Sequence, residues 1–314
     1  MKLGIVDFGT LSLRFDVFQL GELTPIITYR STPRLGDTIY TTGIFGEIGL
    51  LKIKSELESV ARLAKESNTE KIIAVGTSAF RDAQDAEEIV KLVANETGIT
   101  VKILSGEQEA SLTARGIISR ESLLDENILL LDIGGGSTEL TIFHSGKPEK
   151  SLSIDVGVSR LRAEMEQRSL ESVSSSFATT GDRYCPEVLS ATIAQLDLLL
   201  EKTELANISH LPTQIVGSSG TIRALERINL GTSENPRLIT IKSLDLALPK
   251  LIHSSKAELL NVGGVEESRV DVLIPGFIIL SALLKILQPR EIIVSHYSLR
   301  HGVLDCVEKG EWFL

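Results

Sequence analysis

The chain has 314 residues, of which 42% are hydrophobic and 24% charged, and its 42 acidic against 32 basic residues give a net charge of −10. At about 150 residues per domain, this length predicts two domains that each bury a core. The composition excludes a disordered chain, and the acidic balance argues against a protein that binds nucleic acid or anionic membranes. A phosphorylated ligand held in a local site remains compatible with this charge.

The sequence predicts neither export nor transition-metal binding. Asp7 interrupts the apolar stretch that a signal peptide requires, and the longest uncharged run, residues 272–284, is too short to cross a bilayer. Cys185 and Cys306 match no zinc or redox spacing, and the five histidines form no ligand pair. We therefore expect a reduced, cytoplasmic protein whose oxygen ligands suit a hard cation such as Mg²⁺.

Short apolar runs alternate with amphipathic stretches, a pattern typical of an α/β fold with a partly parallel sheet. In chain order, we expect strands at 3–6, 12–20 and 26–30, a helix at 47–65, a strand at 71–75, a helix at 82–95, a strand at 99–103 and a helix at 107–118. After a polar connection at 119–127 the pattern starts again. It predicts strands at 128–131, 138–143 and 148–155, helices over 159–202 interrupted by a loop at 172–182, a strand at 214–216, helices at 221–228 and 268–287, a strand at 291–294 and a terminal helix at 299–310.

Two short motifs recur in the same order along the chain. The segment IVDFGTLS at 5–12 resembles LDIGGGST at 131–138, and VGTSAFR at 75–81 resembles VGSSGTIR at 216–223. An ordered repeat of this kind predicts two halves of like fold that face each other. Four turns rich in Gly, Ser and Thr would then converge on one cleft.

These turns suit a phosphate ligand. A glycine-rich turn lets backbone N–H groups approach a phosphate with no Cβ in the way. Asp7 and Asp132 stand at strand ends, where they can hold Mg²⁺, while two helix N-termini and Arg81 favour anions. Each turn alone is more often only a turn, but the ordered double pair favours a polyphosphate-type ligand. Further hydroxyl donors are Thr10, Ser12, Ser137 and Thr138.

Two acidic residues open the helix expected at 107–118. Glu107 and Glu109 are two positions apart, so one can face the cleft while the other is solvated. Both would also suit the positive N-terminal end of a helix, and spacing alone favours that simpler interpretation.

Five segments carry a resemblance to a known family: VGTSAFRD at 75–82, LSGEQEA at 104–110, LDIGGGSTEL at 131–140, VGSSGTIRA at 216–224 and RVDVLIPG at 269–276. In this order they resemble the exopolyphosphatase/guanosine pentaphosphate phosphohydrolase family, in its short form without a C-terminal HD-type helical domain. The resemblance implies an α/β fold of two duplicated ribonuclease H-like domains, of the actin, Hsp70 and sugar-kinase superfold, flanking a cleft. The first domain would comprise residues 1–125 plus 299–314, and the second residues 126–298.

The resemblance also implies roles for single residues. Glu109 would be the general base that activates water, Glu139 a second catalytic or Mg²⁺-linked acid, and Asp132 a metal-site carboxylate beside Asp7. The turns and the resemblance together give the expected phosphate-binding residues Gly9, Thr10, Ser12, Arg81, Gly134, Gly135, Gly136, Ser137, Gly217, Ser218 and Gly220.

Two positions and one short segment depart from the family pattern. Leu11 replaces an asparagine in the first turn, which removes an amide that could bind phosphate or a neighbouring turn. His301 stands where the family has glutamate, and the preceding segment 295–297 carries larger side chains than expected. We expect His296 and His301 to be structural or peripheral rather than catalytic.

The expected function is the Mg²⁺-dependent hydrolysis of terminal phosphoanhydride bonds of inorganic polyphosphate, with release of orthophosphate. Guanosine pentaphosphate is the second substrate considered. The alternatives are a non-catalytic nucleotide-binding regulator and an ATP-dependent small-molecule kinase on the same superfold. A bound K⁺ and a homodimer are compatible with the resemblance, and no nucleic-acid or membrane partner is expected.

Overall fold

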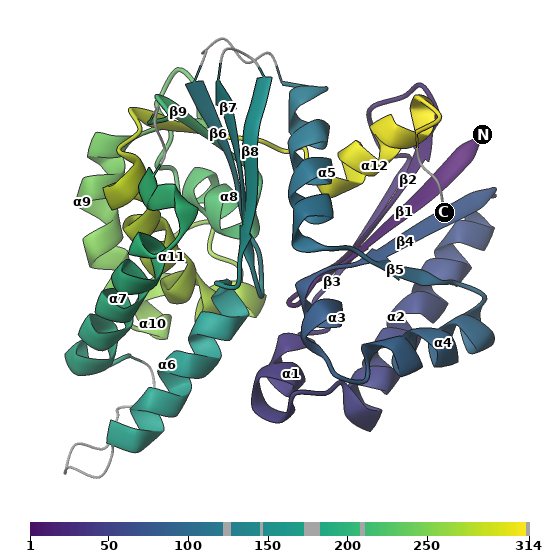
Figure 1. The fold of residues 1–314 in the computed structure, drawn as a ribbon, viewed down its shortest axis with the longest axis horizontal. Helices are drawn as coiled ribbons and strands as arrows, with labels where there is room; N and C mark the ends of the chain where they lie inside the picture. The colour runs from purple at the N-terminus through teal and green to yellow at the C-terminus, as the bar shows by residue number, and fades with distance from the viewer. Residues whose placement is uncertain (122–126, 145–146, 173–182, 208–210, 312–314) are drawn as a thin grey trace.

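The computed structural model describes residues 1–121, 127–144, 147–172, 183–207 and 211–311. Two mixed β-sheets covered by helices form two lobes that lie side by side (Figure 1). Helices α5 (Gly106–Ile118) and α12 (Leu299–Glu308) lie between the two sheets. The arrangement therefore places the chain segments just before these two helices close to the junction of the lobes.

The first lobe contains a five-stranded sheet of order β3-β2-β1-β4-β5, in which β1 is antiparallel to β2 and parallel to β4. Its strands are β1 (Lys2–Phe8), β2 (Leu13–Gln19), β3 (Ile27–Ser31), β4 (Lys71–Gly76) and β5 (Val101–Ile103). Its helices are α1 (Gly36–Thr42), α2 (Gly46–Glu66), α3 (Ser78–Asp82) and α4 (Ala86–Thr97).

The second lobe contains a six-stranded sheet of order β10-β11-β9-β6-β7-β8. Its strands are β6 (Asn127–Ile133), β7 (Thr138–His144), β8 (Lys147–Ile154), β9 (Gln214–Gly217), β10 (Leu238–Thr240) and β11 (Glu291–Val294). Its helices are α6 (Val158–Ser172), α7 (Pro186–Glu201), α8 (Gly220–Arg227), α9 (Ile241–Ile252), α10 (Lys256–Leu260) and α11 (Val270–Leu287), with 3₁₀ turns at Glu204–Asn207 and Glu267–Arg269.

The two sheets have the same topology. The order β8-β7-β6-β9-β11 repeats β3-β2-β1-β4-β5, and β10 is an additional strand antiparallel to β11. The corresponding pairs agree in direction, since β6 is antiparallel to β7 and parallel to β9. The predicted fold class, a duplicated α/β architecture, is confirmed.

Strand β1 explains why the first lobe has two layers of helices. Its apolar residues face both sides of the sheet, because successive side chains of a strand alternate between faces. Val6 and Phe8 pack into one core together with residues of α2 and α4, whereas Leu3 and Ile5 pack with α12 on the other face. A strand that is apolar on both faces therefore requires cover on both, and the last helix of the chain supplies one of the layers.

Helix α5 contacts both sheets. Leu112 belongs to the core that α12 forms with the first sheet. Ala114 and Ile117 pack instead against strands of the second sheet, among them Ile128 and Val216. The position of α5 is thus fixed from both lobes.

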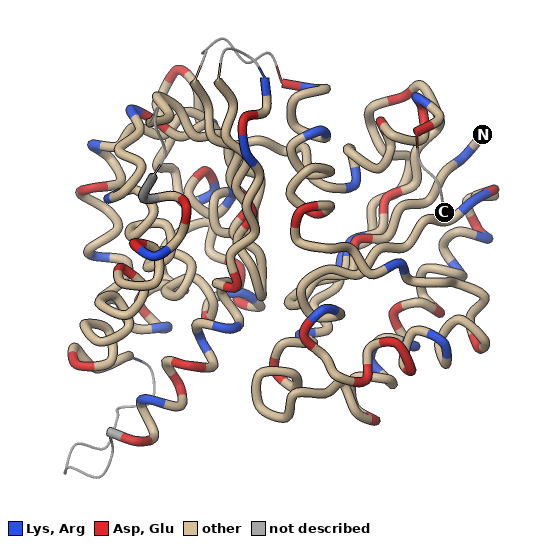
Figure 2. The backbone as a smooth tube through the Cα atoms, in the orientation of Figure 1, with Lys and Arg blue, Asp and Glu red and all other residues tan. Residues whose placement is uncertain are grey.

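The long apolar segment Glu267–Leu287 is a helix of the second core. Among the described residues it alone is long and apolar enough to cross a membrane, by length and composition only, and 72% of its apolar window is buried. Figure 2 shows acidic and basic residues distributed over the helices of both lobes. The burial of α11 against its neighbours accounts for its composition.

Several elements differ from the sequence expectations. The helix expected at 82–95 begins only at Ala86, because Ala83 is extended (ψ 125°), and residues 78–82 form the separate short helix α3. Helices α1, α9 and α10 and strand β10 were not expected; α9 even contains Pro249, a residue that normally ends a helix. The terminal helix ends at Glu308. The loop at 172–182 lies almost wholly outside the described residues, as does the domain boundary at 125/126, so both stay predictions.

The contact between α5 and α12 generates a prediction about stability. A Cβ at position 302 would lie 1.8 Å from the carbonyl oxygen of Leu112, and one at position 116 would lie 2.2 Å from that of Ser298. Gly302→Ala should lower the free energy of unfolding by roughly 1–3 kcal/mol, because the helices must separate, although alanine favours a helix by about 1 kcal/mol.

The control is Gly263→Ala, where an added Cβ meets no atom within 4 Å. Urea unfolding of the two variants measures the difference. Equal stability of Gly302→Ala and Gly263→Ala would contradict the close helix contact.

Candidate active site

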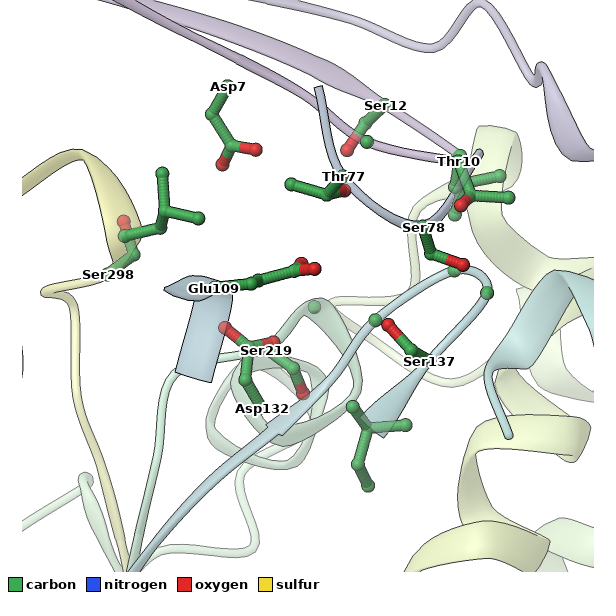
Figure 3. A pocket seen from close by; sticks show the side chains of 18 of the residues that line it. Asp7, Thr10, Ser12, Thr77, Ser78, Glu109, Asp132, Ser137, Ser219 and Ser298 are labelled. Carbon is green, nitrogen blue, oxygen red and sulfur yellow. The ribbon is translucent and has the colours of Figure 1, made fainter. Parts of the chain in front are cut away.

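A pocket of about 90 Å³ lies between the lobes where the four repeated turns meet. Figure 3 shows the Glu109 side chain extending across it, with Asp7 and Thr77 on one side of the view and Asp132 and Ser219 on the other. The volume is below the roughly 300–1,000 Å³ of most ligand sites. The turns of the two lobes therefore approach each other closely around a small pocket.

The two glycine-rich turns have the same backbone geometry. The N–H of Gly9 donates to the carbonyl of Ser12 at 3.0 Å, and the N–H of Gly134 donates to the carbonyl of Ser137 at 2.9 Å. The turns also interlock, because a Cβ at Gly135 would lie 2.9 Å from the backbone nitrogen of Leu11. Glycine at position 135 is thus required by the close approach of the first lobe.

Leu11, one of the departures from the family pattern, crosses between the lobes. Its side chain is buried and belongs to the apolar core of the second lobe, together with Leu131 and Ile133. The residue also lines the pocket. The change from an amide to an apolar side chain therefore adds a hydrophobic contact between the lobes.

Glu109 enters the pocket from the first turn of α5. Ser105 caps this helix: its hydroxyl accepts the N–H of Gln108 at 3.2 Å, and the Gln108 side chain accepts the N–H of Ser105 at 2.9 Å. Glu107 is exposed, whereas Glu109 lines the pocket and accepts a hydrogen bond from Arg81 Nη1 at 2.7 Å. Burial raises the pKa of Glu109 to about 7, although Arg81 acts in the opposite direction.

Glu139 is buried behind the pocket surface, on β7. Its Oε1 accepts hydrogen bonds from the hydroxyls of Ser137 at 2.6 Å and Ser153 at 3.0 Å, and Arg81 Nη2 lies 4.0 Å away. Burial, and then repulsion from Glu109, hold the pKa of Glu139 well above its usual range. Glu139 therefore contacts the pocket through Ser137.

Asp7 and Asp132 occupy corresponding positions near the ends of β1 and β6. Asp7 Oδ2 accepts from Arg300 Nη1 at 3.2 Å, and Asp132 Oδ2 accepts from the Ser218 hydroxyl at 2.9 Å. Burial raises the pKa of Asp132. In the described part of the chain, the Oδ1 atom of each has no hydrogen bond, and both residues line the pocket.

No three His, Cys, Asp or Glu side chains of the described residues are grouped so that they could hold a metal by themselves. Mg²⁺, however, is commonly bound by one or two carboxylates, waters and the phosphates of a substrate. The free oxygens of Asp7 and Asp132 fit that mode of binding. A dedicated all-protein metal cage does not fit these residues.

Two arginines that sequence reasoning missed line the same pocket. The guanidinium groups of Arg14 and Arg269 make no hydrogen bond or ion pair with any described residue. Burial and then repulsion from Arg300 hold the pKa of Arg14 well below its usual range, and burial lowers the pKa of Arg269 to about 10. On β2, Arg14 stands between the apolar residues Leu13 and Phe15. Because side chains alternate between the faces of a strand, this pattern was the sequence signal that places Arg14 on the polar face.

The structure brings most of the expected site residues together. Glu109, Asp7 and Asp132 line the pocket, and so do the phosphate-site candidates Gly9, Thr10, Ser12, Gly134, Gly135, Gly136, Ser137, Ser218 and Gly220. Arg81 lies beside it and donates to Ser137 Oγ at 3.3 Å. Gly217 is not part of the lining and packs against Ile222.

The two histidines lie away from the pocket lining. His301 Nδ1 accepts the N–H of Ser298 at 3.2 Å at the start of α12, and its ring contacts Phe18 and Tyr297. Burial and then Arg300 lower the pKa of His301 to about 4. His296 is exposed and lies 2.8 Å from Glu226.

The repeated topology and the pocket between the lobes define a two-domain α/β protein with duplicated sheets. The chain belongs to the Ppx/GppA phosphatase family, whose model matches residues 16–310. It is 25% identical over 312 residues to exopolyphosphatase 1 of Mycobacterium tuberculosis, an alignment covering 97% of this chain and 87% of the relative. The family suggested by the sequence is confirmed.

Solved structures support the same assignment. An exopolyphosphatase from Cytophaga hutchinsonii is 25% identical with a TM-score of 0.85, covering 99% of this chain and 98% of the other. A Ppx/GppA family member from Aquifex aeolicus has a TM-score of 0.76 at 24% identity, covering 100% and 99%. The similarity to the Aquifex aeolicus protein supports the fold alone.

The buried carboxylate of Glu139 generates a prediction about stability and pH. Its pKa is higher in the folded than in the unfolded chain, so the folded state binds more protons and loses stability as pH rises above about 4.5. Glu139→Gln removes the buried charge, so it should raise the melting temperature at pH 8, on the order of 2 °C or more, and change it less at pH 5.

Thermal unfolding at the two pH values measures this effect. Glu234→Gln, at an exposed position in a loop, is the control and should show no such pH dependence. A melting temperature that falls at pH 8 in Glu139→Gln would contradict the expected cost of the buried charge.

Proposed function

We propose that the protein is an exopolyphosphatase that hydrolyses the terminal phosphoanhydride bond of inorganic polyphosphate and releases orthophosphate. The observation that carries the proposal is the pair Arg14 and Arg269, two half-buried guanidinium groups that make no hydrogen bond or ion pair within the described chain, beside the glycine-rich turns. Removing a cation from water is costly unless it is paired. A polyanion in the pocket would supply the missing negative charge.

Glu109 is the proposed general base. Its carboxylate faces the pocket and would accept a proton from a water molecule, whose oxygen attacks the terminal phosphorus while the bond to the bridging oxygen breaks. The backbone N–H groups of the glycine-rich turns and the Ser137 hydroxyl would hold the terminal phosphate in line with that water. Arg81, already hydrogen-bonded to Glu109 and Ser137, would add a charge-assisted contact to the same phosphate.

Asp7 and Asp132 are the proposed carboxylates for Mg²⁺, with Glu139 supporting the site from behind Ser137. When bound, Mg²⁺ would neutralise negative charge on the phosphate oxygens. Arg300 holds Asp7 in place through a hydrogen bond of 3.2 Å, and Ser218 does the same for Asp132 at 2.9 Å. These contacts leave one oxygen of each carboxylate for the cation.

The lining of the pocket favours an inorganic chain over a nucleotide. It contains no Phe, Tyr, Trp or His side chain among the described residues, so no ring is placed to stack on a base. The matched family is described as Ppx/GppA phosphatases, and the relative from Mycobacterium tuberculosis is named an exopolyphosphatase. The lining supports polyphosphate as the substrate. The net charge of −10 is compatible with an anionic substrate because local groups in the pocket would bind it. The same charge argues against a nucleic-acid or membrane partner, and we propose a cytoplasmic protein.

A substrate panel tests the proposal. With Mg²⁺ present, purified protein should release orthophosphate from polyphosphates of several lengths, and more slowly from guanosine pentaphosphate; chelation of the metal should abolish the release. Transfer of phosphate from ATP to an acceptor would instead identify a kinase. Tight binding of guanosine pentaphosphate without any release would identify a non-catalytic regulator.

The role of Glu109 is tested separately. Glu109→Gln should lower kcat roughly a hundredfold or more, whereas Glu107→Gln, on the exposed side of the same helical turn, should leave it unchanged. Because the base acts when deprotonated and its pKa is about 7, the wild-type rate should fall as the pH drops below 7. The residual rate of Glu109→Gln should lack this fall, and a near-wild-type rate would remove Glu109 from the role.

A further inference from the structure

We infer that Arg160 is a positioning residue that shapes the second glycine-rich turn for phosphate binding and does so only when the two lobes are in contact. The inference rests on the proposed function of that turn. Arg160 lies in the first turn of α6, outside the pocket lining, and none of the sequence motifs pointed to it.

The N-terminal end of α6 holds three successive carbonyl groups of the turn. The N–H of Val158 donates to Gly134 at 3.0 Å and that of Ser159 to Gly135 at 2.7 Å. The carbonyl of Gly136 is beyond this backbone ladder, and it accepts instead from Nε of Arg160 at 3.0 Å. Arg160 thus completes, with its side chain, a set of bonds that the helix backbone begins.

These bonds determine which groups of the turn face the ligand. With its carbonyls directed at α6, the turn cannot present them to an anion, for which a carbonyl oxygen would be repulsive. Gly135 and Gly136 line the pocket, and their N–H groups make no hydrogen bond within the described part of the chain. Loss of the Arg160 bond would free the peptide that follows Gly136 to rotate.

The other end of the guanidinium group is held by the first lobe. Arg160 Nη2 donates to Asp82 Oδ2 at 2.8 Å, and this oxygen also accepts from the hydroxyls of Ser78 at 3.0 Å and Tyr40 at 3.2 Å. The guanidinium lies 4.8 Å from the centre of the Tyr40 ring. The residue that orients the second-lobe turn is therefore itself oriented by three side chains of the first lobe.

The turn and this cluster are in direct contact. A Cβ at Gly136 would lie 2.2 Å from both Ser78 Oγ and Tyr40 Oη. Separation of the lobes would move Asp82, Ser78 and Tyr40 away together. The guanidinium group of Arg160 would then lose the contacts that orient it. The bonds that fix the turn therefore require the two lobes to be in contact, as they are in this structure.

A simpler role for Arg160 is an ion pair that merely ties the lobes together, and the chain offers a control for it. Arg162 lies on the same helix and also pairs across the lobes, with Asp37. Its other hydrogen bond is to Asp271 in the second lobe, and it makes none to the glycine-rich turn. Arg160→Met and Arg162→Met thus each remove one interlobe ion pair, but only the first releases Gly136.

Steady-state hydrolysis of polyphosphate by these variants is the first measurement. Arg160→Met should lower kcat by roughly ten- to a hundredfold, the effect of a misplaced binding group, and Arg162→Met should keep kcat within about threefold of wild type while changing KM. Arg160→Lys retains the charge but cannot bridge Gly136 and Asp82 as a planar fork, so it should recover only part of the rate. Asp82→Asn combined with Arg160→Met should be no worse than Arg160→Met alone.

Hydrogen exchange of the backbone amides of Gly134 and Ser159, whose N–H groups bond within the turn and onto it, is the second measurement, and it needs no activity. Exchange should be faster in Arg160→Met than in wild type and unchanged in Arg162→Met. If wild type does not hydrolyse polyphosphate, the proposed function fails while exchange still decides the role of Arg160. Equal kinetics and equal exchange in the two methionine variants would overturn the inference and leave Arg160 as an ordinary interlobe ion pair.

Discussion

The packing of α5 between the two sheets is the constraint on which the site depends. Leu112 contacts the core of the first sheet and Ala114 and Ile117 that of the second, so the helix cannot move relative to one lobe without disturbing the other. Glu109 stands in the first turn of this helix and projects into the pocket. The proposed general base is therefore carried by the helix that both lobes hold in place.

Buried charges of both signs are concentrated at the same junction, which is costly unless they are paired. Arg300 is paired with Asp7 and with Asp16, and Arg81 with Glu109, whereas Arg14 and Arg269 are not paired in the described chain. The shifted pKa values of Glu109 and Glu139 have the same origin, burial with incomplete compensation. Perturbed pKa values of this kind cluster at functional sites.

Much of the fold could be predicted because the internal repeat is visible in short sequence motifs. The apolar strand before Asp7 and the one before Asp132, each followed by a glycine-containing turn, indicated the duplication and the elements at which the turns stand. Helices α9 and α10 and strand β10 escaped prediction because Pro249 and short polar connections hide their periodicity. Arg160 escaped because its partners, Gly136 and Asp82, are 24 and 78 residues away.

The sequence by itself determined the duplicated α/β class, the turns that meet between the lobes and the acidic residues Asp7, Glu109 and Asp132 that line the pocket there. These features follow from spacing within a few residues, which fixes strand ends, helix starts and the faces on which side chains point. Only the tertiary structure decided which charges are neutralised, that Leu11 packs into the opposite lobe and that His301 caps a helix. Such outcomes depend on how deeply a residue is buried and on contacts with residues distant in the chain. A short sequence segment determines neither of these.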